Sequence, residues 1–405
     1  MQSQSVVVRA ECRPMEGVDR PGPHQIYRDP QVSVEVRELG ELWPHKIRVE
    51  MIYAGVCGTD VHAVQTNPKT GYIRCSAPLD IPSEGRIIGH EGVGKVLAVG
   101  SEVRHVKPGA IVTFESIIVC HFCDACRRGY FNQCHRAKLL GLEKDGVFGT
   151  IVDLPSLLTH DVSDLAASDT GLKAAACVEP AGVAYVACQN TKISGGDVVV
   201  IFGAGPIGLF TAMLCDAVFG ASRVVIVEPV ARRRDLARKW CDEVYDVEEF
   251  FDRLPDPKNG LACNVDVVVE ASGDLSNVKR VFRCLSANSR VSLLARGGAS
   301  LTLDSIDHMI TNGIRLVGSR GHLGGAFSDV LRLYRTGRMP LDAIVTDVVE
   351  GADGLADLLN DPDRIVEDGC KVLADFSSRA AREVGAVKSG QMGNVDAQPV
   401  GPIAR

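Results

Sequence analysis

The chain has 405 residues, of which 45% are hydrophobic and 5% aromatic, so it is long enough for two domains with separate cores. Its 51 acidic residues outnumber its 44 basic residues, which gives a formal net charge of −7. No long basic run is present that could follow a phosphate backbone, so the composition argues against nucleic acid as a partner.

Cysteine usage and the start of the chain indicate the compartment. Outside one loop the fourteen cysteines are scattered, which indicates buried thiols in a reducing cytosol rather than a disulfide framework. The opening residues, MQSQSVVVRAECRP, lack the basic lead-in and the apolar core of a signal peptide. We therefore expect a cytoplasmic protein.

The first part of the chain combines a strand pattern with metal-binding residue types. Residues 31–115 hold short apolar segments separated by Gly and Pro, which predict a mostly β region. Cys57 lies in GVCGTDVH, His90 and Glu91 lie in GHEG, and Glu179 lies in CVEPAG. A catalytic zinc needs about three protein ligands and one exchangeable position. We expect Cys57 and His90 to be ligands, with either Glu91 or Glu179 as the carboxylate.

A second metal-binding pattern is confined to one short loop. Its cysteines follow the spacing CxxCxxCx7C, which suits tetrahedral capture of one zinc ion by thiolates. Four thiolates leave no open coordination position, so this ion can hold structure but cannot bind a substrate. The residues are Cys120, Cys123, Cys126 and Cys134.

From Gly195 onward the pattern changes to alternating strands and helices. Apolar runs such as VVVIF, RVVIVE and VDVVVEA are separated by segments of helix length, which predicts a parallel sheet with crossover helices. Val198 to Cys215 carries no charge over eighteen residues and so imitates a membrane span. GAGP at 203–206 interrupts it, so we expect a buried strand followed by a helix, and no membrane contact.

The turn inside this segment carries the GxGxxG pattern of a dinucleotide site. The first glycine permits a tight turn, the second lets the backbone approach a pyrophosphate, and the third lets helix and strand pack closely. The helix N-terminus offers unpaired N–H groups to the phosphates. The residues expected to bind the cofactor here are Gly203, Gly205, Pro206, Ile207 and Gly208.

The end of the next strand predicts the choice of cofactor. Glu228 closes RVVIVE, where a carboxylate can accept hydrogen bonds from the ribose hydroxyls and would repel a 2′-phosphate, so NAD is favoured over NADP. Arg232, Arg233 and Arg234 follow, and an arginine near this strand end can instead hold a 2′-phosphate. The alternative is a solvated first helical turn. Arg233 is the candidate cofactor contact among them.

The last part of the chain returns to mixed structure. AFSDVLRLYRTGRM predicts an amphipathic helix, and DAIVTDVV and CKVLADF predict strands that could belong to either domain. Residues 377–405 have no aromatic side chain and are rich in Gly, Ala and polar residues, so we expect a disordered tail.

Five motifs occur in a fixed order, namely GVCGTDVH, GHEGVGKVLAVG, the cysteine loop, EPAGVA and GAGPIG. In this the chain resembles the zinc-dependent medium-chain dehydrogenase/reductase family of the alcohol dehydrogenase superfamily, in particular its polyol and threonine dehydrogenase branch. The resemblance covers roughly residues 30–375. It implies an α/β protein with a GroES-like, mostly β catalytic domain at 1–184 and 325–376. A Rossmann nucleotide domain with a doubly wound parallel sheet would be inserted at 185–324, and the protein would be a homodimer or homotetramer.

The resemblance also implies an activity. Cys57, His90 and a carboxylate would hold the catalytic zinc, Thr59 would relay a proton, and His62 would pass it to solvent. Thr59 could instead satisfy its turn, and His62 could fill a helix. We expect two zinc ions per subunit, and hydride transfer between NAD and a secondary alcohol of a polyol, cyclitol, sugar or amino alcohol. The open alternatives are an NADP-linked carbonyl reductase and a non-catalytic nucleotide-binding relative.

Overall fold

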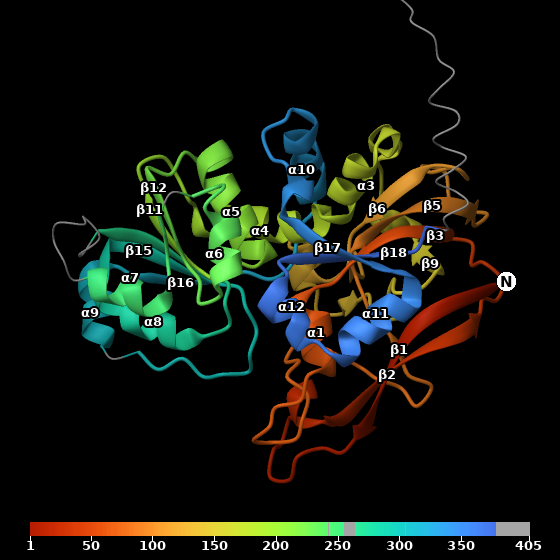
Figure 1. Ribbon diagram of the computed structural model, residues 1–405, viewed down its shortest axis with the longest axis horizontal. Helices are drawn as coiled ribbons and strands as arrows, with labels where there is room; N and C mark the ends of the chain where they lie inside the picture. The colour runs from red at the N-terminus through yellow and green to blue at the C-terminus, as the bar shows by residue number, and fades with distance from the viewer. Residues whose placement is uncertain (242, 255–263, 304, 378–405) are drawn as a thin grey trace, which may run out of the picture.

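The computed structural model describes residues 1–241, 243–254, 264–303 and 305–377, coloured along the chain in Figure 1. The expected disordered tail at 377–405 lies outside the described residues except for Ser377. Two sheets of different kinds lie on opposite sides of the molecule, with α4 (Val178–Thr191) and α10 (Ala326–Arg335) between them (Figure 1).

The larger sheet draws strands from both ends of the chain. Its order is β10-β6-β5-β3-β18-β17, and β9 pairs with β3 beside this path. The C-terminal strand β18 pairs antiparallel with β3, so the strands predicted from DAIVTDVV and CKVLADF are confirmed and belong to this sheet. The members are β3 (Lys46–Gly55), β5 (Gly92–Val99), β6 (Ile111–Phe114), β9 (Ile151–Pro155), β10 (Thr159–Asp161), β17 (Val345–Glu350) and β18 (Lys371–Asp375).

Two smaller sheets complete this region. A three-stranded sheet contains β1 (Gln2–Cys12), β2 (Tyr27–Glu38) and β4 (Arg86–Ile87), and a pair is formed by β7 (Ile117–Ile118) and β8 (Lys138–Leu139). The sequence pattern placed the start of the β region at residue 31, whereas strand structure begins at Gln2. Val6, Val7 and Val8 are all buried, so β1 lacks the inside-outside alternation that marks a strand with one solvated face.

The second sheet has six parallel strands in the order β13-β12-β11-β14-β15-β16. The chain moves outward from β11 in both directions, so the point of reversal lies between β11 and β14, where such sheets bind dinucleotides. The strands are β11 (Val198–Phe202), β12 (Arg223–Val227), β13 (Glu243–Tyr245), β14 (Val265–Glu270), β15 (Leu285–Leu293) and β16 (Arg315–Gly318).

Short helices connect these strands and close both regions. The uncharged segment starting at Val198 forms β11 and then α5, as predicted, and no described helix is long and apolar enough to cross a membrane. The remaining helices are α1 (Gly58–Val64), α2 (Asp124–Arg127), α3 (Asp169–Ala176), α5 (Pro206–Leu214), α6 (Ala231–Ala237), α7 (Val247–Arg253), α8 (Leu275–Val281), α9 (Ile306–Asn312), α11 (Gly351–Asn360) and α12 (Asp363–Asp368).

One hydrophobic cluster joins the two regions. It contains Tyr53 and Leu373 from the larger sheet together with Val199 and Phe210 from the parallel sheet and α5. Burial of these side chains holds the two regions in one arrangement. The domain boundaries expected at 185 and 325 stay a prediction, and the first of them falls inside α4.

The turn from β11 into α5 depends on its glycines. Gly203 has φ +99°, a conformation that residues with a Cβ rarely adopt. A Cβ added at Gly208 would lie 1.9 Å from the carbonyl oxygen of Gly203, whereas one added at Gly205 would meet nothing within 4 Å. Gly208 is therefore required by packing, while Gly205 leaves open space in front of the helix.

Because only Gly208 is closely packed, substitutions at Gly208 and Gly205 should have different effects on stability and on ligand binding. Gly208→Ala should lower the free energy of unfolding by about 1–3 kcal/mol because the added methyl group overpacks the turn. Gly205→Ala should leave stability within about 0.5 kcal/mol, yet weaken binding of a reduced dinucleotide because the methyl group occupies the approach of the pyrophosphate. Urea denaturation and fluorescence titration measure the two effects, and equal destabilisation by both substitutions would contradict the assignment.

Candidate functional site

The four cysteines of the CxxCxxCx7C loop meet at α2. Their sulfur atoms all lie within 4.8 Å of one another, and the four residues are free thiols rather than disulfides. The separation of the Sγ atoms is 3.5 Å for Cys120 and Cys134, 3.8 Å for Cys123 and Cys134, and 4.0 Å for Cys120 and Cys126. Sulfurs about 2.3 Å from a central zinc at tetrahedral angles are about 3.8 Å apart. The donor set therefore fits one zinc ion with no room for another ligand.

Backbone N–H groups point at the same sulfurs. Cys123 N–H donates to the Sγ of Cys120 over 3.4 Å, and Arg136 N–H donates to the Sγ of Cys134 over 3.3 Å. Hydrogen bonds from the backbone of Cys126 and His135 lower the pKa of the Cys123 thiol to about 6. Such donors stabilise thiolates, the form that binds metal.

The second group of candidates begins at the N-terminus of α1. Cys57 caps this helix, and its N–H donates to the Asp60 carboxylate over 3.0 Å. The other carboxylate oxygen of Asp60 accepts from Gly89 N–H over 3.2 Å and lies 3.5 Å from Nδ1 of His90. Asp60 is fully buried and places a carboxylate at ion-pair distance from Nδ1 of the His90 ring.

Glu91, one of the two candidate carboxylate ligands, is already paired with a cation. Its Oε1 forms a buried ion pair with Nζ of Lys371, which also donates to the carbonyl of Val56 over 3.0 Å. Burial alone would lower the pKa of Lys371, but the charges of Glu91, Cys177 and Cys57, together with the hydrogen bond to Glu91, outweigh burial and raise it. Both side chains are about 1% exposed, so the pair is isolated from water. The second oxygen of Glu91 is buried without a hydrogen-bond partner.

Glu179 reaches the same area from the first turn of α4. It accepts a hydrogen bond from Ser116 Oγ over 3.1 Å, and Ser116 in turn contacts Nε2 of His322 over 3.1 Å. Because this Nε2 also accepts from the N–H of Ser116, the Ser116 hydroxyl hydrogen is directed to Glu179. Burial raises the pKa of Glu179 to about 7, while the positive charge of His90 acts in the opposite direction.

The ligand atoms of Cys57, His90, Glu91 and Glu179 are not as close to one another as those of the four cysteines. Among the described residues, the cysteine group alone has ligand atoms that all lie within 4.8 Å of one another. Cys57 and His90 interact electrostatically, as do His90 and Glu179, whereas Glu91 is held by Lys371. His90 Nδ1 and Glu91 Oε2 are buried polar atoms without hydrogen-bond partners. Buried atoms of this kind beside a cysteine fit a metal site.

The candidate proton relay starts at the same helix. Thr59 Oγ1 lies 3.8 Å from the Sγ of Cys57. His62 follows on α1 and is partly buried, and burial, followed by the charge of Arg74, lowers its pKa. Among the described residues no hydrogen bond joins Thr59 to His62, so the relay stays a prediction.

Four functional neighbours were missed by the sequence reasoning. Asp60 stands inside GVCGTDVH, and its position three residues after the helix cap was the signal for its contact with Cys57. Lys371 is the single cation of β18 and stands directly before three apolar residues. Ser116 and His322 gave no signal, because 206 residues separate them along the chain.

At the nucleotide turn, Glu228 is 3% exposed and fixed by backbone donors. Its oxygens accept from Ala204 N–H over 2.7 Å and from Val230 N–H over 2.9 Å. Arg233 donates to the carbonyls of Gly369 and Ile365, over 2.9 and 3.1 Å. Its contact with a cofactor stays a prediction, because these donors are already used between α6 and the C-terminal segment.

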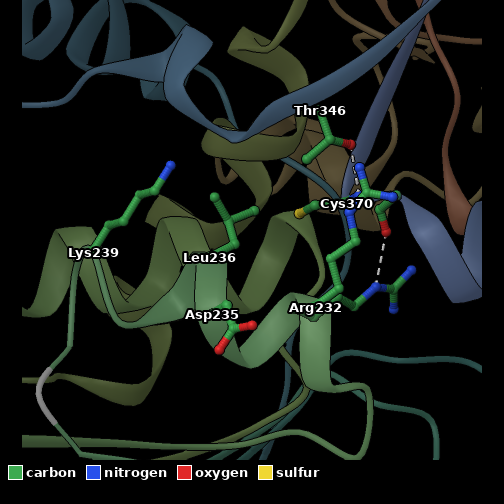
Figure 2. Close-up of a pocket in the computed structure, with 8 residues that line it drawn as sticks. Arg232, Asp235, Leu236, Lys239, Thr346 and Cys370 are labelled. Atoms are coloured by element: carbon green, nitrogen blue, oxygen red, sulfur yellow. Dashed lines mark hydrogen bonds between the residues drawn. The ribbon is translucent and has the colours of Figure 1, made fainter.

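A pocket of about 270 Å³ lies between α6 and the strands β17 and β18, and Figure 2 shows Leu236 and Cys370 at its wall. Thr346 Oγ1 accepts from Cys370 N–H over 2.9 Å inside it (Figure 2). Neither the candidate metal ligands nor the glycines of the nucleotide turn line this pocket. It is therefore separate from the candidate reactive centre.

Comparison with known proteins gives consistent matches. The alcohol dehydrogenase GroES-like domain model matches residues 43–164, and the zinc-binding dehydrogenase model matches residues 206–336. L-threonine 3-dehydrogenase of Pyrococcus horikoshii is 31% identical over 80% of this chain and 88% of its own length. Scyllo-inosose 3-dehydrogenase of Thermotoga maritima is 32% identical over 80% and 85%. The crystal structure of 2R,3R-butanediol dehydrogenase from Bacillus subtilis shares the fold, with a TM-score of 0.73 at 22% identity over 93% of this chain and 99% of that structure.

The buried ion pair predicts a non-additive stability effect. Lys371→Met should lower the free energy of unfolding by about 3–5 kcal/mol, because it leaves the charge of Glu91 buried and unpaired. Adding Glu91→Gln in the same chain should restore most of this loss. The exposed pair of Arg335 and Asp164 is the control, and Arg335→Met should cost less than about 1 kcal/mol. Urea denaturation measures all of them, and additive losses in the double variant would contradict the buried pair.

Proposed function

The chain belongs to the zinc-dependent medium-chain dehydrogenase family, and we propose that it is an NAD-dependent alcohol dehydrogenase with two zinc ions per subunit. Its substrate would be a secondary alcohol of a polyol, cyclitol, sugar or amino alcohol, or the corresponding ketone. The relatives named for L-threonine and scyllo-inosose support this range. We also propose that the nucleotide domain spans residues 185–324.

The observation that carries the proposal is the contact of His90 with Asp60. A carboxylate that holds one ring nitrogen of a histidine fixes the tautomer and presents the other nitrogen to a metal. The Asp60 carboxylate is fully buried and lies 3.5 Å from Nδ1, within ion-pair distance, so it would hold this nitrogen while Nε2 faces a metal. Cys57 caps α1, the helix that carries Asp60, and would be the second ligand beside His90.

Glu179 is the third ligand in this proposal. Lys371 already balances the charge of Glu91, whereas the nearest polar partner of Glu179 is the neutral hydroxyl of Ser116. One thiolate and one carboxylate then balance the charge of a zinc ion, and one coordination position stays open. The structural zinc would be held by the four cysteines of the loop.

The residues of the chain then have distinct tasks. When bound, the zinc ion supplies Lewis-acid stabilisation of negative charge on the alcohol oxygen, and the nicotinamide supplies a hydride acceptor. Thr59 Oγ1 takes the hydroxyl proton and passes it towards His62. Because burial lowers the pKa of His62, its ring is neutral near pH 7 and able to accept that proton.

Glu228 favours NAD over NADP in this proposal. Its carboxylate is fixed by two backbone N–H groups and cannot turn away from a 2′-phosphate. Arg233 and Arg234 do not offset this charge freely, since each donates to backbone carbonyls. The NADP-linked reductase is therefore the weaker candidate.

We further propose a cytoplasmic homodimer or homotetramer. β16 is the last strand in the order of the parallel sheet, and Leu316 on it is exposed. An edge strand of this kind can continue the sheet into a second copy.

Activity assays test the class and the cofactor together. A panel of polyols, cyclitols and amino alcohols, followed by the absorbance of reduced cofactor, should give turnover with NAD. The value of kcat/KM should be at least about tenfold higher with NAD than with NADP, because a 2′-phosphate would meet the carboxylate of Glu228. Glu228→Ser should narrow this ratio. Turnover with NADP alone would support the reductase, and no turnover with any alcohol or ketone would support a non-catalytic relative.

Substitution of single cysteines tests the two metal sites. Cys57→Ser should remove one of two zinc ions per subunit and lower kcat by more than about a hundredfold, while the unfolding temperature stays close to that of the wild type. Cys123→Ser should instead lower the unfolding temperature, because a closed thiolate site contributes folding energy. Elemental analysis and thermal unfolding measure both outcomes, and full turnover by Cys57→Ser would refute the catalytic assignment.

A further inference from the structure

Two arginines lie side by side at one edge of the parallel sheet. Arg296 comes three residues after the end of β15, and Arg320 comes two residues after the end of β16. These strands are paired in parallel, with Leu293 opposite Gly318, so both arginines follow carboxyl ends of neighbouring strands. Ser319 N–H donates to the carbonyl of Leu293 over 3.1 Å and ties the two loops together.

The strand order places these arginines away from the pyrophosphate turn. β11 carries that turn, and β14, β15 and β16 follow it on one side, while β12 and Glu228 lie on the other. Neighbouring strands are about 4.8 Å apart, so β15 is about 10 Å and β16 about 14 Å from β11. Since Glu228 marks the adenosine side, Arg296 and Arg320 lie on the nicotinamide side of the sheet.

Electrostatic interactions connect Arg296 with the candidate reactive centre. The charge of Arg296 acts on the buried thiol of Cys75, which also interacts with Asp60 and Cys57. The loop of Arg320 is held from the other side, because Asn132 of the cysteine lobe donates to the Arg320 carbonyl over 2.8 Å. The charge of Arg296 therefore acts on the region around Cys57, and the loop of Arg320 contacts the cysteine lobe.

Neither guanidinium has an acidic partner among the described residues. Burial, followed by repulsion from Arg320, lowers the pKa of Arg296, and the one attractive charge acting on it is Cys75. Two other arginines of this sheet have acidic partners: Arg290, on β15 itself, pairs with Asp197 over 2.6 Å, and Arg223 pairs with Glu243 over 2.5 Å. Two like charges held together without a carboxylate provide a recognition site for an anion.

We propose that Arg296 and Arg320 bind an anionic group of the substrate, a carboxylate or a phosphate, next to the carbon that exchanges hydride. This inference rests on the proposed function and narrows its substrate to acidic or phosphorylated polyols. The pyrophosphate of the cofactor is the competing occupant of this site. It would instead bind at the end of β11, where the N-terminus of α5 supplies backbone N–H donors. Planar guanidinium groups suit either oxyanion through two parallel hydrogen bonds.

Binding measurements test the proposal without turnover. The zinc-loaded enzyme saturated with NADH would be titrated by calorimetry with sorbitol, gluconate and sorbitol 6-phosphate. At least one anion should bind roughly tenfold to a hundredfold more tightly than sorbitol. Arg296→Gln and Arg320→Gln should each remove most of this preference and leave sorbitol binding within about threefold, while Arg296→Lys should restore part of it.

Control measurements separate the alternatives. Arg315→Gln removes one positive charge at the opposite end of β16 and should leave the affinities for sorbitol and for both anions unchanged. The dissociation constant of NADH should be the same for the wild type and the two glutamine variants. Equal binding of sorbitol and both anions by the wild type would overturn the proposal, and so would weaker NADH binding in the arginine variants, which would assign them to the pyrophosphate.

The result of the binding measurements can be told apart from the result of the activity assays. If the enzyme oxidises neutral polyols and binds neither anion preferentially, the substrate inference fails while the dehydrogenase assignment stands. If no alcohol is oxidised with either cofactor, the dehydrogenase assignment fails, and the calorimetric preference still decides whether the arginine pair binds anions.

Discussion

The buried contact of Lys371 with Glu91 and the Val56 carbonyl connects three distant parts of the chain at one point. Lys371 begins the C-terminal strand β18, Glu91 directly follows His90, and Val56 directly precedes Cys57. An ion pair with almost no exposure to water is costly unless both charges are matched, so its geometry leaves little freedom. The positions of Cys57 and His90 therefore depend on a strand formed some 280 residues later in the sequence.

The residues that could touch a metal or a substrate are few, and each is held by another. Asp60 orients His90, Lys371 holds Glu91, and Ser116 holds Glu179. His322 extends this support into the loop that follows the parallel sheet, where Asn132 of the cysteine lobe fixes the backbone. The cysteine lobe and the candidate ligand Glu179 are thus connected through one loop.

Local patterns were sufficient for much of this organisation. The cysteine spacing predicted a closed four-sulfur group, and the glycines after VVVIF predicted a strand, a tight turn and a helix, because these features depend on neighbours in sequence. β1 was not predicted, since its three valines are all buried and its partner strand lies beyond a long connection. Lys371 and His322 could not be found either. A single Lys in an apolar strand or a single His in a glycine-rich loop acquires its partner only when the sheet is assembled.

The carboxyl edge of the parallel sheet carries opposite charges at its two ends. On one side of β11, Glu228 presents a fixed negative charge, and on the other side Arg296 and Arg320 present unbalanced positive charge. A dinucleotide lying across this edge would place its 2′-hydroxyl near the carboxylate and its nicotinamide near the arginines. Each end can then exclude one class of molecule. Under the proposed assignments, Glu228 would repel a 2′-phosphate and the two arginines would repel a cationic substrate, so one arrangement of charges would govern both choices.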